Sequence, residues 1–322
     1  MTAFRCGILL LTIVPTLAAA EPSTPPKQRT FQFTCVGSVT DLKPGETARV
    51  WLPVPSSNDD QDVAILSQET PTAAKLGREM LYGNRILFFE ALADAEGKVA
   101  FKIVYKVTRR EVKGEASKEI AEDMARLARL LKPDAKVPIE GKPIDLLKGK
   151  PVPADQMEAA RLLYDVVNNH MRYSKEGTGW GNGDSVWACE SRYGNCSDFH
   201  SLFISLARSQ KIPAIFEIGF PLPEKRGAGD VPGYHCWAKF KAAGKGWIPV
   251  DISEANKHPE LKGYYFGNLT EDRIAFSTGR DLELVPKQDG PPLNFFVHPY
   301  VEVAGKPLAK EKIKPRYSFK DE

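Results

Sequence analysis

A turn followed by the start of a helix is predicted at Tyr193-Gly194-Asn195-Cys196-Ser197-Asp198-Phe199-His200. The Gly-Asn pair tolerates backbone conformations that other residues resist, and the Ser-Asp pair is favoured at helix starts. Apolar side chains then recur on one helical face, at Phe199, Leu202, Phe203, Leu206 and Ala207. Cys196 therefore lies at or beside the N-terminus of an amphipathic helix.

The position of Cys196 makes it a candidate nucleophile. Unpaired backbone N–H groups and the positive end of the helix dipole favour a thiolate over a thiol. A thiolate at neutral pH can attack a carbonyl carbon. A buried structural cysteine, or one half of a disulfide, is the commoner role of a single cysteine. The assignment therefore depends on residues further along the chain.

The composition is that of an ordinary soluble globular protein. The chain has 322 residues, of which 42% are hydrophobic and 26% charged, and its net charge is +3. This length suffices for one large domain or two of ordinary size. The near balance of charge, without a basic stripe and interleaved aromatic residues, argues against a nucleic-acid-binding protein. No stretch is long and apolar enough for a membrane helix, so we expect no stable membrane insertion.

The N-terminus has the pattern of a secretory signal peptide. Arg5 supplies a positive charge, Gly7 to Leu17 form a short apolar segment, and Ala18-Ala19-Ala20 is a small-residue cleavage site. We expect cleavage after Ala20 and a secreted or periplasmic mature protein. Residues 21–29 are rich in proline and polar side chains and are expected to be a disordered spacer.

Four cysteines remain after this cleavage, namely Cys35, Cys189, Cys196 and Cys236. An even number of cysteines in an exported protein favours disulfides, and three full pairings are open. If all four were paired, no thiol would remain for chemistry. We expect one disulfide, with Cys189–Cys236 as a candidate pair, and a free Cys196 together with one further thiol.

The hydrophobic periodicity changes along the chain from that of strands to that of helices. From Thr30 to Thr108, short alternating runs separated by turns predict a small β-sandwich. Helices are predicted at Ala116–Leu131 and at about Asp155–Met171, and a glycine-rich loop at Ser174–Ser185. The final charged residues are expected to be loose.

Two later strands bring a histidine and an aspartate together. Strands are predicted at His235–Phe240 and Gly246–Asp251, joined by a turn. If the hairpin is centred on Ala243, His235 and Asp251 stand opposite each other on one face, with Cβ atoms about 5 Å apart. A carboxylate at that distance can accept a hydrogen bond from an imidazole. A histidine oriented in this way is one half of a nucleophilic apparatus, and Cys196 is the other.

Three sequence blocks resemble the signature of the transglutaminase-like superfamily. The first is Arg192-Tyr193-Gly194-Asn195-Cys196-Ser197-Asp198-Phe199, followed by Leu206-Ala207-Arg208 and Lys211-Ile212-Pro213-Ala214. The second and third are similar to the His and Asp blocks of the family, and read Tyr234-His235-Cys236-Trp237-Ala238 and Trp247-Ile248-Pro249-Val250-Asp251. Linked blocks are far more specific than a single motif. The resemblance covers roughly residues 155–285 and is strongest to bacterial exported members with a β-rich domain ahead of the core.

The resemblance implies a papain-like core and thiol chemistry on amide bonds. Cys196 would be the nucleophile, His235 the general base and acid, and Asp251 the residue that orients the histidine. The implied fold class is α+β, with an N-terminal β-sandwich-like domain before a papain-like transglutaminase core. The expected divisions are a signal peptide at 1–20, a spacer at 21–29, a β-rich domain at 30–115, a helical linker at 116–154, the core at 155–285 and a C-terminal β extension and tail at 286–322.

The implied reaction passes through a thioester. The Cys196 thiolate attacks a carboxamide or peptide carbonyl, His235 protonates the leaving amine, and an amine or water resolves the thioester. The outcome is then acyl transfer, deamidation or proteolysis. The oxyanion needs hydrogen-bond donors, for which the Cys196 backbone N–H and the indole of Trp180 or Trp187 are candidates. We expect a protein or peptide substrate, such as one of the cell envelope, and neither cofactor nor metal.

Three other assignments compete with this one. His200 lies one helical turn after Cys196 and is a rival partner of the thiol, although a packed core histidine is the commoner role. A zinc site could gather Cys189, Cys196, His200, His235 and Cys236, but these residues include no close-spaced ligand pair such as CxxC. Neighbouring strand residues also point to opposite faces. A non-catalytic binding or structural module with the same fold is the third alternative.

Overall fold

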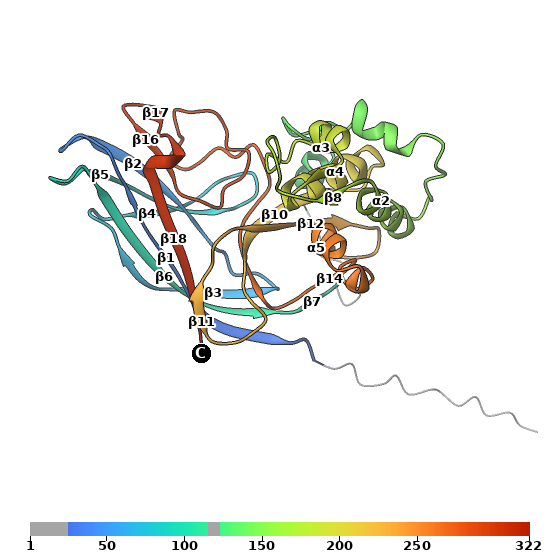
Figure 1. The fold of residues 1–322 in the computed structure, drawn as a ribbon, viewed down its shortest axis with the longest axis horizontal. Coiled ribbons are helices and arrows are strands. Elements are labelled where there is room, and N and C mark those ends of the chain that lie inside the picture. The colour runs from blue at the N-terminus through green and yellow to red at the C-terminus, as the bar shows by residue number, and fades with distance from the viewer. Residues whose placement is uncertain (1–24, 115–122) are drawn as a thin grey trace, which may run out of the picture.

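The computed structural model describes residues 25–114 and 123–322. The predicted signal peptide, residues 21–24 of the predicted spacer and residues 116–122 of the first predicted helix lie outside the described residues. Within the described part, no helix is long and apolar enough to cross a membrane. A β-sandwich and a core of helices around a smaller sheet lie side by side (Figure 1).

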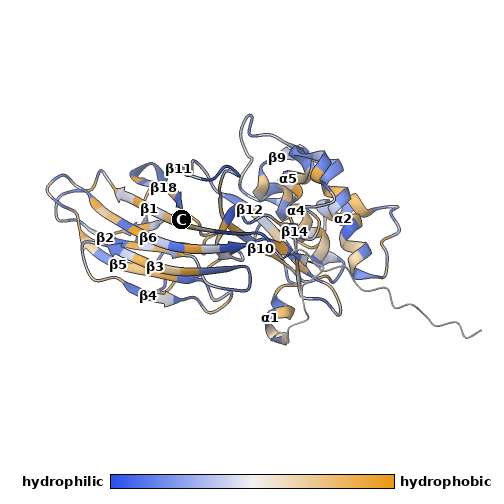
Figure 2. Ribbon diagram, turned by 90° about the horizontal axis from the view of Figure 1, so that it is seen from below, coloured by the Kyte–Doolittle hydropathy of each residue, from blue (hydrophilic) through white to orange (hydrophobic). Residues whose placement is uncertain are grey.

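Two five-stranded sheets form the β-sandwich. Its strands are β1 (Gln28–Val39), β2 (Thr47–Val54), β3 (Gln61–Glu69), β4 (Lys75–Arg78), β5 (Arg85–Leu92), β6 (Val99–Arg110), β11 (Ala228–Asp230), β16 (Tyr300–Val303), β17 (Lys306–Pro307) and β18 (Ile313–Asp321). The strand orders are β11-β18-β1-β6-β3 and β17-β16-β2-β5-β4. Hydropathy alternates along the strands (Figure 2), and one face of each sheet is buried in a shared apolar core. The predicted β-rich N-terminal region is confirmed.

The last charged residues form a strand inside the sandwich, so the expectation that they are loose is wrong. β18 pairs with β1 from Val39↔Ile313 to Phe31↔Asp321. Tyr317 and Phe319 point into the core and are 7% and 5% exposed, whereas the basic residues that flank them, Lys314, Arg316 and Lys320, are exposed. Strand alternation needs only every second residue to be apolar, which explains why a charge-rich tail can pair here.

The core is built on a four-stranded antiparallel sheet covered by helices. The strands are β10 (Ala214–Pro221), β12 (His235–Lys241), β13 (Trp247–Val250) and β15 (Arg273–Thr278), in the order β13-β12-β10-β15. The helices are α2 (Gln156–His170), α3 (Ser185–Ser191), α4 (Cys196–Ser209) and α5 (Ile252–Lys257). The two helices predicted around residues 155–171 and after Cys196 are present. The seven residues of α3 are too few for a periodic pattern, and the sequence did not reveal it.

Short elements complete the chain and position the turn before Cys196. They are β7 (Val112–Lys113), α1 (Met124–Arg129), η2 (Lys142–Leu147), β8 (Arg172–Tyr173), β9 (Tyr193–Gly194), η3 (Pro259–Leu261), β14 (Asn268–Leu269) and η4 (Lys310–Lys312). β8 pairs in parallel with β9. This short ladder ties the end of α2 to the turn that leads into α4.

Helix α4 is buried on all sides rather than on one face. Every residue from Cys196 to Arg208 is buried. Its polar side chains are paired individually: Ser201 bonds to Arg280, and Arg208 donates to Asp134 at 2.7 Å. A buried polar group is costly unless it is hydrogen-bonded. The partners come from distant segments, which is why the apolar stripe alone suggested a half-exposed helix.

The hairpin that carries the histidine has a different register from the predicted one. β12 and β13 pair Ala238 with Val250 and Lys241 with Trp247, which centres the turn on Gly244 rather than on Ala243. Gly244 has φ +70, and glycine adopts this left-handed conformation without the cost that a Cβ brings. Asp251 therefore follows the last strand pair instead of standing opposite His235.

The sandwich packs directly against the sheet that bears the site. Phe220 of β10 stacks on Tyr317 of β18 with ring centroids 4.2 Å apart and on Phe33 of β1 at 5.3 Å. Lys239 of β12 forms an ion pair with Asp60 at 2.6 Å. These contacts join β10 and β12 to the sandwich.

Candidate active site

Cys196 is the first residue of α4, with Asn195 as the N-cap. The Asn195 Oδ1 accepts a hydrogen bond from the Ser197 N–H at 2.9 Å, and the Asp198 carboxylate accepts one from the Asn195 N–H at 3.0 Å. These two bonds form a capping box. Cys196 is 2% exposed. The predicted position at a helix N-terminus is thus present.

Asp198 also holds the glycine-rich loop beside Cys196. Its two carboxylate oxygens accept hydrogen bonds from the N–H groups of Gly181, at 2.7 Å, and Gly183, at 2.9 Å. Both glycines have positive φ, +84 and +58, which permits this tight approach. Burial and the charge of Cys196 raise the pKa of Asp198 to about 6, against the lowering effect of its N–H donors.

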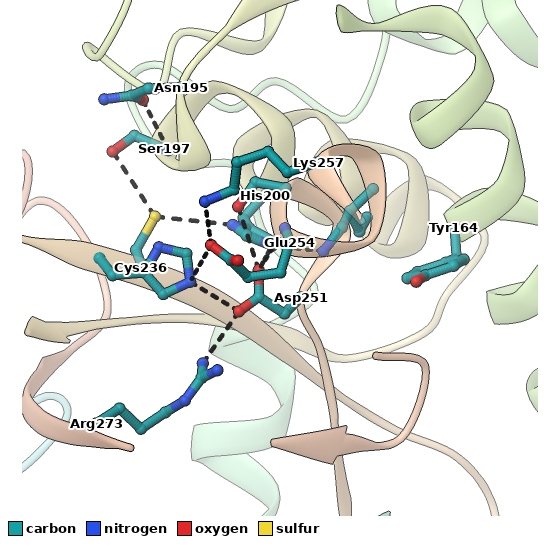
Figure 3. A network of polar contacts seen from close by, with 12 residues as sticks. Tyr164, Asn195, Ser197, His200, Cys236, Asp251, Glu254, Lys257 and Arg273 are labelled. Atoms are coloured by element: carbon teal, nitrogen blue, oxygen red, sulfur yellow. Dashed lines mark hydrogen bonds and ion pairs between the residues drawn. The ribbon is translucent and has the colours of Figure 1, made fainter. Parts of the chain in front are cut away.

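His235 and Asp251 form the predicted contact, although the register differs. The Nε2 atom of His235 lies 2.7 Å from Oδ2 of Asp251. Arg273 on β15 donates to the same oxygen at 3.0 Å, and the other oxygen caps α5 by accepting from the Glu254 N–H at 3.1 Å. Figure 3 shows Asp251 between Arg273 and α5. Burial opposes ionisation, but the cations His235 and Arg273 hold the pKa of Asp251 far below its usual range.

The Cys196 thiolate and the His235 imidazolium stabilise each other as an ion pair. Burial opposes the charge on Cys196, but hydrogen bonds from Cys236 and His235 and the positive charge of His235 lower its pKa well below that of a free thiol. Burial also opposes the charge on His235, yet Asp251 and Cys196 raise its pKa to about 10. Because Nε2 faces Asp251, the Nδ1 atom is the one available to Cys196. A thiolate beside an imidazolium is the activated state that nucleophilic attack requires.

His200 is a buried, neutral histidine that supports the site from behind. Its Nε2 accepts a hydrogen bond from the Ile252 N–H at 3.0 Å, and its Nδ1 lies 3.7 Å from the Cys236 sulfur. Burial lowers the pKa of His200 to about 4, against the raising effect of Asp251 and Cys196. The rival partner of the thiol is therefore joined to α5 and Cys236.

The burial of His200 predicts that the free energy of unfolding of the protein falls in mild acid. The pKa of His200 is lowered from 6.5 to about 4 on folding, so the unfolded chain binds the proton first as the pH falls. The contribution of His200 is therefore full above pH 6.5 and is lost as the pH falls towards 4. When the pH is lowered from 7 to 5, the free energy of unfolding should fall by about 2 kcal/mol less in His200→Asn than in the wild type.

Urea denaturation at both pH values measures this difference. His258→Gln, at a surface histidine whose side chain is 51% exposed, is the matched control and should keep the wild-type pH dependence. An unchanged pH dependence in His200→Asn contradicts the prediction.

The two tryptophans predicted as oxyanion donors are held by other contacts. The Trp180 indole N–H donates to the Gly177 carbonyl of its own loop at 3.1 Å. The Trp187 ring packs edge-to-face with Tyr193, with centroids 5.3 Å apart, and lies so close to Gly179 that a Cβ there would be 2.6 Å from its Nε1. Both side chains thus shape the glycine-rich loop.

All four cysteines in the described part of the chain are free and buried, so the expected disulfide is wrong. The Cys189 sulfur lies 3.6 Å from the Lys142 carbonyl, whereas the Cys236 sulfur lies 3.7 Å from the Ser197 hydroxyl. The candidate pair therefore faces different surroundings.

Among the described residues, the group that could hold a metal ion is His235, Asp251 and Glu254. It consists of the His–Asp pair and one further carboxylate, and differs from the cysteine-rich set considered from the sequence. Arg273 and Lys257 already pair with its carboxylates.

The sequence did not single out two groups that the structure brings to the site. Arg273 comes from β15, and no local pattern marks it as the partner of Asp251. Tyr234 stands within the His block, directly before His235, and this adjacency was the available signal. Its hydroxyl lies 3.0 Å from the Asn195 Nδ2 and 3.3 Å from the Ser197 Oγ.

Comparisons with known proteins agree with this architecture. Residues 146–252 match the model of the transglutaminase-like superfamily. The chain is 29% identical over 308 residues to an uncharacterized protein of Haemophilus influenzae, covering 82% of each. A solved structure from Cytophaga hutchinsonii, described as a candidate cysteine protease, is similar with a TM-score of 0.52 at 17% identity, covering 92% of this chain and 100% of that one. At this identity the structural likeness concerns the fold alone.

Proposed function

The chain carries a domain of the transglutaminase-like superfamily at residues 146–252, and from this premise we propose that it is a cysteine enzyme acting on amide bonds. One observation carries the proposal: a buried cysteine at a helix N-terminus lies beside a histidine whose far nitrogen is 2.7 Å from a buried aspartate. We further propose that the protein acts outside the cytoplasm, after removal of the predicted signal peptide.

The reaction begins with the Cys196 thiolate, which attacks the carbonyl carbon of a carboxamide or peptide. The tetrahedral intermediate collapses when His235 gives its proton to the leaving amine, and a thioester forms on the Cys196 sulfur. Neutral His235 then takes a proton from water or from an acceptor amine, which attacks the thioester. Asp251 holds the imidazole in the tautomer that presents Nδ1 to the sulfur.

The acceptor decides the product. Water gives deamidation of a glutamine-like carboxamide or hydrolysis of a peptide bond, and a primary amine gives a cross-link. The substrate class is a protein or peptide. The solved structure from Cytophaga hutchinsonii, described as a candidate cysteine protease, shares the fold with this chain.

The pH dependence of thiol alkylation tests this proposal. We expect iodoacetamide to label Cys196 at a rate that changes little between pH 6 and 8, because the pKa of this thiol lies well below its usual value. An ordinary thiol loses about tenfold in thiolate with each pH unit below its pKa. At pH 6, Cys196 should therefore react about 100-fold faster than a free cysteine. Mass spectrometry of peptides identifies the labelled residue.

The protein supplies its own controls. Burial raises the pKa of Cys35 to about 12 and also raises that of Cys189, so both should stay unlabelled. His235→Ala removes the imidazolium and should restore an ordinary pH dependence at Cys196. If wild-type Cys196 already shows that dependence, the ion pair is absent and a non-catalytic module is the better description.

A further inference from the structure

The hydroxyl of Tyr234 is held at the start of α4 by the two residues that flank Cys196. It lies 3.0 Å from the Asn195 Nδ2 and 3.3 Å from the Ser197 Oγ. The ring rests between Phe295 and His298, with centroid distances of 5.9 and 6.0 Å. Tyr234 and its neighbour His235 therefore both lie next to Cys196.

The direction of the hydrogen bond from Asn195 to Tyr234 is fixed. The Asn195 Oδ1 accepts from the Ser197 N–H, so the remaining group of the amide is the Nδ2 donor. An amide nitrogen donates and cannot accept. The oxygen of Tyr234 is therefore the acceptor in this bond.

The direction of the second bond follows from His200. Its Nε2 accepts from the Ile252 N–H, so in the neutral ring Nδ1 carries the proton and cannot accept the S–H of Cys236, whose sulfur lies 3.7 Å away. Figure 3 shows this line of contacts from His200 through Cys236 to Ser197. The Cys236 S–H is then left to donate to the Ser197 Oγ or to the Cys196 thiolate. In both cases the better acceptor for the Ser197 hydroxyl proton is the Tyr234 oxygen, because oxygen accepts more strongly than sulfur.

Because the Asn195 amide and the Ser197 hydroxyl both donate to the Tyr234 oxygen, the hydroxyl proton of Tyr234 has no acceptor among these residues. A phenol both accepts and donates hydrogen bonds, and in this arrangement the Asn195 Nδ2 and the Ser197 hydroxyl are the donors to its oxygen. Burial and the negative charge of Cys196 raise the pKa of Tyr234 above its usual value, so the phenol keeps its proton. That proton is available to a group bound at the sulfur.

A second donor lies on the backbone of Cys196 itself. The N–H groups of the next residues are engaged: Ser197 donates to the Asn195 side chain, and Asp198 and Phe199 donate to the Asn195 carbonyl. Among the hydrogen bonds of the described residues, none uses the Cys196 N–H. An open N–H at the first position of a helix, where the dipole is positive, suits a negative oxygen.

We propose that Tyr234 is a catalytic residue whose hydroxyl, together with the Cys196 backbone N–H, stabilises the oxyanion of the tetrahedral intermediate. This assignment rests on the proposed function and takes the place of Trp180, whose N–H is used inside its loop, and of Trp187. Tyr234 donates a hydrogen bond to the oxygen that becomes negative and retains its proton throughout. Preorganised donors aimed at a developing charge are usually a large part of the rate enhancement.

Tyr234→Phe tests the proposal with two probes on the full mature chain. With p-nitrophenyl acetate, the thiolate attacks the ester carbon, an S–C bond forms, the C–O bond breaks and p-nitrophenolate leaves. This acylation passes through an oxyanion, whereas alkylation by iodoacetamide is a displacement without one. We expect Tyr234→Phe to slow acylation of Cys196 by about 100- to 1,000-fold and to leave the alkylation rate and its pH profile within about twofold of wild type.

The two probes separate the possible failures. If wild-type Cys196 is neither alkylated near neutral pH nor acylated, the proposed function fails and this assignment fails with it. If wild type reacts with both probes and Tyr234→Phe acylates as fast as wild type, the role of Tyr234 alone is overturned. An equal loss in both rates also overturns it, since that pattern indicates a general distortion of the site.

A matched variant controls for the loss of a nearby phenol. Tyr193→Phe removes the hydroxyl of a tyrosine whose ring packs edge-to-face with Trp187. This hydroxyl lies 3.5 Å from where a Cβ on Gly177 would stand. We expect its ratio of acylation to alkylation to equal that of wild type. If Trp180→Phe selectively lost acylation while Tyr234→Phe did not, the oxyanion donor would be the Trp180 indole N–H.

Discussion

Asp251→Asn is expected to slow acylation of Cys196 by about 1,000- to 10,000-fold. Asp251 is fully buried and accepts hydrogen bonds from His235 at 2.7 Å and Arg273 at 3.0 Å. Asparagine keeps the size of the side chain but removes the negative charge that stabilises the imidazolium. Its amide N–H₂ can also face His235 and favour the wrong tautomer. The thiolate then loses the cation that holds it ionised.

The rate of p-nitrophenolate release measures this effect, and the alkylation profile confirms its cause. In Asp251→Asn, alkylation of Cys196 should regain the pH dependence of an ordinary thiol. Glu254→Gln is the matched control, because it makes the same chemical change on a carboxylate whose oxygen lies 3.8 Å from the His235 Nε2. We expect a loss below tenfold there. A flat alkylation profile in Asp251→Asn would show that Asp251 does not sustain the ion pair.

Deletion of residues 313–322 is expected to abolish folding of the sandwich. The deletion removes β18, which pairs with β1 from Phe31 to Val39, and takes Tyr317 and Phe319 out of the apolar core. Loss of one buried aromatic side chain costs about 3–5 kcal/mol, and a typical domain is stable by only about 5–15 kcal/mol. The removal of two such side chains and a strand ladder therefore exceeds what the fold can lose.

Thermal unfolding and solubility measure this outcome. Where the deletion gives no soluble protein, Phe319→Ala provides a measurable intermediate, with an expected loss of about 3–5 kcal/mol in unfolding free energy. Lys320→Ala, at the exposed neighbouring position, should change stability by less than about 0.5 kcal/mol. A deleted chain that melts at the wild-type temperature contradicts the role of β18.

The candidate site could be predicted in large part because its signals are local. The turn at Gly194 and Asn195, the helix that begins at Cys196 and the two short strands from His235 to Asp251 each follow from a few neighbouring residues. The contact between His235 and Asp251 forms even though the predicted register is wrong. A hairpin brings its two strands together whichever turn residue it uses, and Asp251 reaches His235 from the first turn after β13.

Several features of the fold could not be predicted because they depend on distant partners. β18 is a strand only because β1 and β11 offer it two edges, and its lysines suggested a loose tail. α4 is buried on all sides because Arg280 and Asp134 satisfy its polar residues. The cysteines are free because Cys189 and Cys236 face different segments, a separation that spacing along the chain does not reveal.

The sequence by itself determined where the reactive groups lie in the chain and which elements carry them, because turn residues, helix caps and hydrophobic periods act over less than ten residues. Only the tertiary structure decided what surrounds those groups. Arg273 reaches Asp251 from β15, and Asn195, Ser197 and Cys236 converge on Tyr234 and Cys196. Charge and proton positions in a buried site are set by through-space contacts within a few ångströms, and such contacts join residues that no sequence window contains.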